Sequence, residues 1–189
     1  MHLKEFTVGS YFRREPAARA DIMFDNYESF PRIINCFEKN LKLMILSEKA
    51  CIRNAHRGEL GVRIQEGTKV SSPTEKQAIE SMMIDQALAT GDFSDSYFKD
   101  LKVMQDIYDG YTEISVMCAE YESFKAAIDA MPDVDRKIIL PILDGSKTRG
   151  ELADELGLTQ EAISQKVKRG RKWIKDNVAI YMADYSVSA

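Results

Sequence analysis

Residues 148–163 read TRGELADELGLTQEAI, and this stretch constrains the fold more than any other part of the chain. Thr148 and Glu151 have the spacing of a capping box, which predicts that a helix begins here. Gly157 predicts the end of that helix, because glycine enters left-handed backbone conformations without a steric penalty. Thr159 can then cap a second helix. The pattern therefore predicts two helices joined by a tight turn, a helix-turn-helix.

Apolar residues at helical spacing predict which sides of these two helices are buried. In the second helix they follow each other in steps of four, three and four, which keeps them on one side. A small residue in the first helix, Ala153, would let the two helices cross closely. The expected inward residues are Leu152, Ala153, Leu156, Ile163, Val167, Gly170 and Ile174, with Leu158 in the turn.

Basic residues gather on the other side of the second helix. Residues 160–175 hold six basic residues and a single acid, Glu161, in a chain whose formal net charge is −4. The second helix of such a motif enters the major groove of DNA with its N-terminal end at the base edges, and cations beside it bind phosphates. Five phosphate contacts would make log K fall with log salt at a slope of roughly −4 to −5. We expect base-reading side chains at Gln160, Glu161, Ser164, Gln165 and Lys168, and phosphate-binding ones at Thr148, Arg149, Thr159, Lys166, Arg169, Arg171 and Lys172. Lys168 would also neutralise a phosphate, so the five phosphate contacts from the second helix are those of Lys166, Lys168, Arg169, Arg171 and Lys172.

The rest of the sequence predicts mainly further helices. Helical spacing runs from Ser29 to about residue 52, from Ser72 to Gly91, and from Asp95 to Ala130, whereas residues 57–73 suggest a loop or a small ribbon. The expected fold class is therefore all-α.

Pro132 marks the expected domain boundary, because the residue before a proline disfavours helix. We expect an N-terminal long-helix hairpin module in residues 1–130, which would serve dimerisation or partner contact. A small C-terminal helix-turn-helix domain would occupy residues 131–189.

An apolar stripe at heptad-like spacing runs through residues 104–128. It would pack either against the helix of residues 29–52 in the same chain or against a second copy in a dimer, and the sequence leaves both alternatives open. Its members are Met104, Ile107, Tyr111, Ile114, Cys118 and Tyr121.

The remaining composition favours a cytoplasmic binding protein without catalytic residues, metal or cofactor. Three distant cysteines without a C-x-x-C pair are expected to be reduced core thiols, and two histidines have no partner at a metal-ligand or triad spacing. The N-terminus lacks the apolar core of a signal peptide, and no run of residues is apolar enough to span a membrane. A glycine-rich phosphate loop is absent as well, so we do not expect an enzyme.

Residues 150–175, GELADELGLTQEAISQKVKRGRKWIK, resemble region 4 of bacterial sigma factors, which reads the −35 promoter element. Thr159, Glu161 and Gln165 fall on the positions where that family carries Thr/Ser, Glu and Gln. Gln160 and Ser164 stand where the family has contacting arginines. Residues 1–130 do not resemble sigma region 2.

The N-terminal part is similar to phage and mobile-element regulators of the ArpU/RinA type, through Ser71, Thr74, Glu75 and Ala78. These resemblances imply a sequence-specific transcriptional regulator that binds double-stranded DNA. A homodimer is expected, and RNA polymerase is a further candidate partner. The alternative is a phage DNA-packaging protein, similar to a small terminase subunit, that carries a helix-turn-helix.

Overall fold

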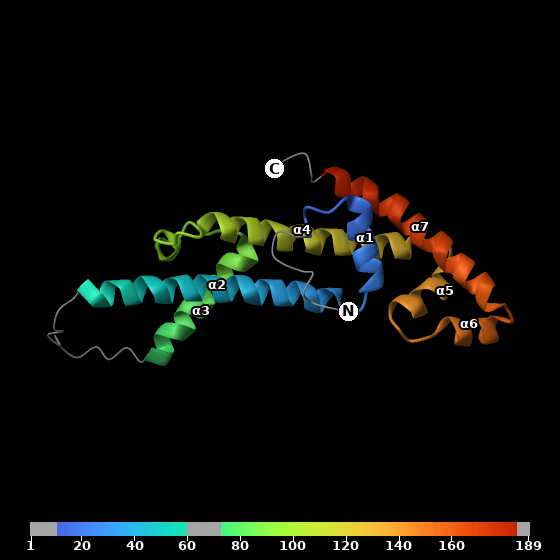
Figure 1. The fold of residues 1–189 in the computed structure, drawn as a ribbon, viewed down its shortest axis with the longest axis horizontal. Coiled ribbons are helices and arrows are strands. Elements are labelled where there is room, and N and C mark those ends of the chain that lie inside the picture. The colour runs from blue at the N-terminus through green and yellow to red at the C-terminus, as the bar shows by residue number, and fades with distance from the viewer. Residues whose placement is uncertain (1–10, 60–72, 185–189) are drawn as a thin grey trace. The chain divides into compact units, whose positions relative to one another are not determined.

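The computed structural model describes residues 11–59 and 73–184, and within these ranges the chain is all-α, as predicted (Figure 1). None of the helices in this part of the chain has the length and apolar character that crossing a membrane requires. The elements are α1 (Pro16–Asp25), α2 (Phe30–Glu59), α3 (Pro73–Thr90), the short 3-10 helix η2 (Ser96–Phe98), α4 (Met104–Asp129), α5 (Asp133–Leu143), α6 (Arg149–Leu156) and α7 (Gln160–Asp184).

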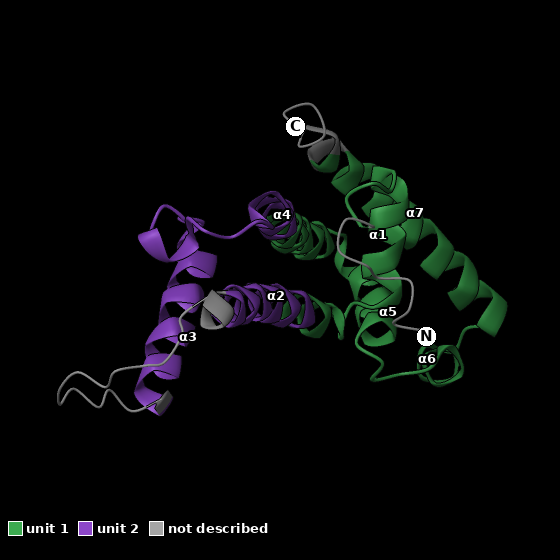
Figure 2. Cartoon of the chain, turned by 60° about the vertical axis from the view of Figure 1, so that its left-hand side comes forward, with its two compact units in different colours: residues 1–35, 113–189 green, residues 36–112 purple. Residues whose placement is uncertain are grey.

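The chain forms two compact units, coloured separately in Figure 2. Unit 1 comprises residues 1–35 and 113–189, and unit 2 comprises residues 36–112. Helices α2 and α4 each contribute to both units. This division differs from the expected boundary near residue 130, because α1 and the C-terminal half of α4 form one core with α5, α6 and α7. A role of the N-terminal helices in dimerisation or partner contact stays a prediction.

Unit 1 is organised around α7, whose apolar side is buried. Ile163, Ile174 and Val178 of this helix are inaccessible to solvent. Gly170 lets α5 approach, since a Cβ atom built on it would lie 1.8 Å from the Cδ1 atom of Ile139, itself fully buried. The unit therefore fixes which side of α7 can face outward.

Unit 2 has its own contacts between α2, α3 and the segment that follows α3. Lys42 and Asp85 pair α2 with α3 at 2.5 Å. Gly91 ends α3 in a left-handed conformation, with φ at +74°, as its position predicted. The ring of Phe93 then packs edge-on against that of Phe98.

Helix boundaries differ from the predictions at several places. The sequence did not predict α1, and α2 continues to Glu59 instead of ending near residue 52. Most of the expected loop or ribbon at 57–73 lies outside the described residues. Helix α4 begins at Met104 instead of Asp95, because the Asp95 carboxylate accepts a hydrogen bond from the N–H of Tyr97 and starts η2.

The buried side of α4 is rotated by about one residue from the predicted stripe. Met117, Phe124 and Ile128 are buried, and so are the carboxylates of Glu113 and Glu120. From the predicted stripe, Ile107 and Ile114 are buried in the single chain and Cys118 is exposed. Pairing of this stripe between subunits stays a prediction.

The expectation of core thiols is wrong for all three cysteines, since Cys36, Cys51 and Cys118 are exposed. The reason is helical register, because the neighbours Phe37 and Met117 hold the buried positions beside Cys36 and Cys118.

Candidate nucleic-acid interface

Helix α6 begins with the predicted capping box. The Thr148 hydroxyl oxygen accepts a hydrogen bond from the N–H of Glu151 at 3.3 Å, and the Glu151 carboxylate accepts one from the N–H of Thr148 at 2.7 Å. The Thr148 hydroxyl also donates to this carboxylate, at 2.8 Å. The two donations, first from the backbone N–H and then from the hydroxyl, lower the pKa of Glu151. Two backbone donors that lack a partner within the helix are satisfied by this exchange.

The turn between α6 and α7 also has the predicted geometry. Gly157 is left-handed, with φ at +62°, and the N–H of Leu158 donates to the carbonyl of Ala153 at 2.9 Å. This 6→1 bond is typical of a Schellman motif. The Thr159 hydroxyl oxygen accepts from the N–H of Ala162 at 3.2 Å and so caps α7. Local sequence signals therefore place the start of α7 correctly.

The two helices bury most of the predicted inward residues. Leu152 and Ala153 of α6 are buried, as are the predicted residues of α7. Leu156 and Leu158 were predicted to be buried but are 45% and 40% exposed. Both flank Gly157, where α6 ends after only eight residues and the chain runs along the surface.

The outer side of α7 presents the predicted base-reading residues to solvent. Glu161, Gln165 and Lys168 are exposed, and Ser164 is half-buried. Gln160 is exposed too, although its amide nitrogen lies 3.1 Å from the position of a Cβ on Gly150 and so lies over the start of α6. The candidate surface therefore begins where the first turn of α7 lies beside the first turn of α6.

Four basic residues of α7 lie on the same outer side as the base-reading residues or at the edge of that side. Arg169 and Lys172 are exposed like Lys168, and Lys166 is half-buried. Within residues 11–59 and 73–184 the structure records no ion pair for any of the four. Arg149, at the start of α6, is also exposed. We call Lys166, Lys168, Arg169 and Lys172 the outer cations. Thr148 and Thr159, also predicted to bind phosphate, use their hydroxyl oxygens for the caps described above.

Arg171 differs from the outer cations, because two aspartates of α1 hold it. Its Nε donates to Asp21 at 2.7 Å, and its two terminal nitrogens donate to the two carboxylate oxygens of Asp25 at 2.7 and 3.2 Å. The guanidinium also lies 4.7 Å from the ring centre of Phe24. The predicted phosphate role of Arg171 conflicts with this pairing, since each of its three nitrogens already donates to a carboxylate.

Lys175 belongs to the same cluster, because its ammonium donates to the second oxygen of Asp21 at 2.5 Å. Burial alone would raise the pKa of Asp21, but the hydrogen bonds from Lys175 and Arg171 outweigh burial and lower it. The Asp21 carboxylate is therefore an ionised partner of α7 at neutral pH. We call Asp21, Asp25, Arg171 and Lys175 the α1–α7 cluster.

Sequence reasoning missed the two aspartates as partners of α7. A signal existed, because Asp21 and Asp25 are four residues apart, as are Arg171 and Lys175. Residues at this spacing share one side of a helix. Two helices with such pairs are complementary in charge, but nothing in the sequence shows that they meet across about 150 residues.

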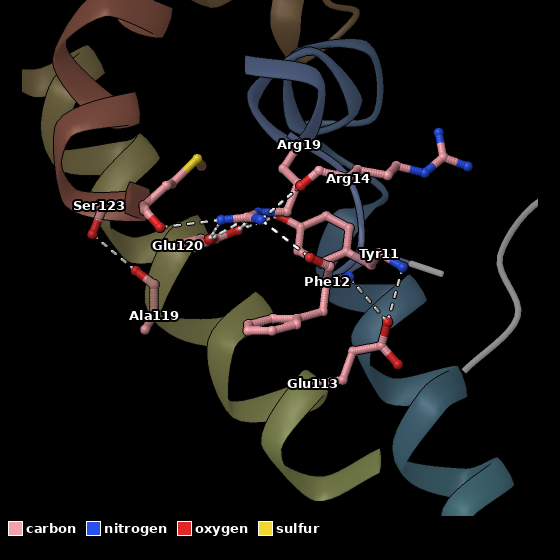
Figure 3. A network of polar contacts seen from close by, with 9 residues as sticks. Tyr11, Phe12, Arg14, Arg19, Glu113, Ala119, Glu120 and Ser123 are labelled. Carbon is pink, nitrogen blue, oxygen red and sulfur yellow. Dashed lines mark hydrogen bonds and ion pairs between the residues drawn. The ribbon is translucent and has the colours of Figure 1, made fainter. Parts of the chain in front are cut away.

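Buried polar contacts hold α1 in place beside α7, as Figure 3 shows. Arg19 is 2% exposed and pairs with the 1% exposed Glu120 of α4 at 2.8 Å. Glu120 also accepts a hydrogen bond from the hydroxyl of Tyr11 at 2.7 Å, and Arg19 donates to the carbonyl of Met182 in α7 at 3.2 Å. Burial raises the pKa values of Glu120 and Tyr11.

Comparison with protein-family models, with curated proteins and with solved structures finds no match for the chain.

Proposed function

We propose that this protein is a sequence-specific transcriptional regulator that binds double-stranded DNA, with α6, the turn at Gly157 and α7 acting as a sigma region 4-like helix-turn-helix. The observation that carries the proposal is the outer side of α7, where Lys168, Arg169 and Lys172 are exposed without a recorded acidic partner in the described part of the chain. Cations in this state can replace the counterions of DNA phosphates.

The proposed contacts divide along α7. Its N-terminal turns would face the base edges with Gln160, Glu161, Ser164, Gln165 and Lys168, because the N-terminal end of such a helix enters the major groove. Glutamine can pair with adenine, and glutamate can accept a hydrogen bond from the amino group of cytosine. Phosphates would be bound by Arg149 and by the outer cations, and the four outer cations alone predict a salt slope of about −3.6.

The phosphate contacts are tested by replacing Lys168 and Lys172 together with alanine. Binding to a random-sequence duplex, followed by fluorescence anisotropy at several salt concentrations, should become weaker with a slope flattened by about 1.8. The matched control is Lys99→Ala with Lys102→Ala, which removes the same charge from two exposed positions in unit 2. Equal effects of the two pairs would reduce the proposal to a nonspecific charge effect.

The base contacts are tested by selecting bound sequences from random duplex DNA. Gln165→Ala should loosen the preference at one or two base pairs, each contributing about 1–3 kcal/mol of discrimination. Gln77→Ala, at an exposed position of α3, is the control and should keep the consensus. A consensus that is the same for wild type and Gln165→Ala would remove Gln165 from the proposed contacts.

The selected sequences also address the proposed partners. A palindrome with half-sites about 34 Å apart would support a homodimer. Selection repeated with RNA polymerase present would show whether the polymerase is a partner. The proposed function also implies a cytoplasmic location.

A further inference from the structure

Two aspartates of α1 bind basic side chains of α7 with the same kind of oxygen atoms that a DNA phosphate would offer. The two oxygens of the Asp25 carboxylate face two nitrogens of the Arg171 guanidinium, at 2.7 and 3.2 Å. Asp21 divides its oxygens between Arg171 and Lys175. Paired oxygens are also what a phosphate offers to arginine. The α1–α7 cluster therefore uses the same donors that DNA would need.

The paired cations continue the row that the outer cations begin. Lys168 lies three residues before Arg171 and four before Lys172, and Lys175 lies four residues after Arg171 and three after Lys172. Residues three and four apart are neighbours on a helix surface. Lys168 and Lys172 are exposed, whereas the side chains of Arg171 and Lys175 are 33% and 29% exposed and ion-paired. The charges of Lys168 and Lys172 are thus available to DNA, whereas those of Arg171 and Lys175 are neutralised within the chain.

We infer that α1 is an intramolecular competitor that withholds Arg171 and Lys175 from DNA, so that Asp21 and Asp25 limit both the affinity and the extent of the phosphate-binding surface. The inference rests on the proposed function, because it concerns the same side of α7. It adds an autoinhibitory contact that lowers binding without blocking the outer cations.

Apolar burial holds α1 in this position independently of the two aspartates. Ala20 and Met23 are fully buried, Phe24 is 8% exposed, and Arg19 is anchored on Glu120. Neutral variants of Asp21 and Asp25 should therefore keep α1 in place while they release the two cations.

The first test is the double variant Asp21→Asn with Asp25→Asn, assayed for binding to random-sequence duplex DNA between 50 and 200 mM salt. Two released cations should steepen the slope of log K against log salt by about 1.8, so that the variant loses about tenfold more affinity over this range than wild type. It should also bind more tightly at 50 mM salt. The matched control is Glu15→Gln with Glu38→Gln, which makes the same change in net charge at two exposed positions.

The second test places Arg171→Gln in two backgrounds. In wild type it should leave the salt slope nearly unchanged, because Asp21 and Asp25 already occupy the guanidinium. In the double asparagine variant it should remove about 0.9 of the gained slope. Circular dichroism of each variant checks that the helices are intact.

The possible outcomes separate the inference from the proposed function. If Arg171→Gln flattens the wild-type slope by about 0.9, Arg171 already contacts DNA and the inference is overturned. The same holds if the double asparagine variant behaves like its control. If wild type does not bind duplex DNA, the proposed function fails and the inference fails with it.

Discussion

The two neighbouring sides of α7 carry the same kinds of residue but differ in how they can be used. On the outer side, Lys168 and Lys172 are exposed, and the described residues provide them no recorded ion pair. On the side toward α1, Arg171 and Lys175 are held by Asp21 and Asp25. A cation on a helix is thus available for a polyanion only if the fold brings no acid beside it.

This difference changes what can be concluded from a charge count. Residues 160–175 contain six basic residues, which suggests one continuous basic surface. Two of the six, Arg171 and Lys175, are already neutralised within the chain. The useful quantity is the number of cations that no acid of the chain pairs. The four outer cations lower the expected salt slope from between −4 and −5 to about −3.6.

The largest effect is expected from removing the Glu120 carboxylate, which anchors α1 through Arg19. Without this anchor α1 should no longer hold Arg171 and Lys175, so the two sides of α7 would become equally available, and the protein should be less stable. Glu120→Gln leaves the buried Arg19 without a charged partner, which should lower the free energy of unfolding by about 3–5 kcal/mol. Urea denaturation followed by circular dichroism measures this change.

Glu122→Gln is the control for that experiment, since Glu122 lies on the same helix in an exposed pair with Lys125. It should change the free energy of unfolding by less than about 1 kcal/mol. Similar losses for both variants would show that the buried pair does not anchor α1.

A smaller effect is expected from Gly170→Ala, which tests the orientation of α7 that separates the two sides. Alanine normally favours a helix over glycine by about 1 kcal/mol. Here the added methyl group would meet the buried Ile139, so the variant should be less stable by about 1–3 kcal/mol in urea denaturation.

Ile139→Val removes the clashing Cδ1 atom and should relieve part of this loss. The double variant should then be more stable than the sum of the two single changes predicts. A stabilised Gly170→Ala variant would mean that α5 does not approach α7 at this glycine.

The α6–turn–α7 segment was predictable because its signals are local. Thr148, Glu151, Gly157 and Thr159 act through hydrogen bonds and backbone conformations that span only a few residues, and all four positions were predicted correctly. The inward stripe of α7 was equally readable from its spacing. Leu156 and Leu158 were wrong, because burial at the end of a short helix depends on what packs over it.

Contacts that join distant parts of the chain were not predictable from one sequence. A stripe of apolar residues does not indicate a helix side that buries charged ones, so the register of α4 that buries Glu113 and Glu120 was not predictable. Arg19 is buried only because Glu120 lies across from it, a pairing over 101 residues. The roles of Asp21 and Asp25 depend on that placement of α1 and were missed for the same reason.

The most direct test of the account compares the reactivity of lysines in α7 with and without duplex DNA. The purified chain is acetylated with an amine reagent, and each lysine is quantified by mass spectrometry. DNA should protect Lys168 and Lys172, whereas the reactivity of Lys175 should stay the same because Asp21 holds it in both states. Protection of Lys175 equal to that of Lys168, or no protection of any lysine in α7, would contradict this expectation.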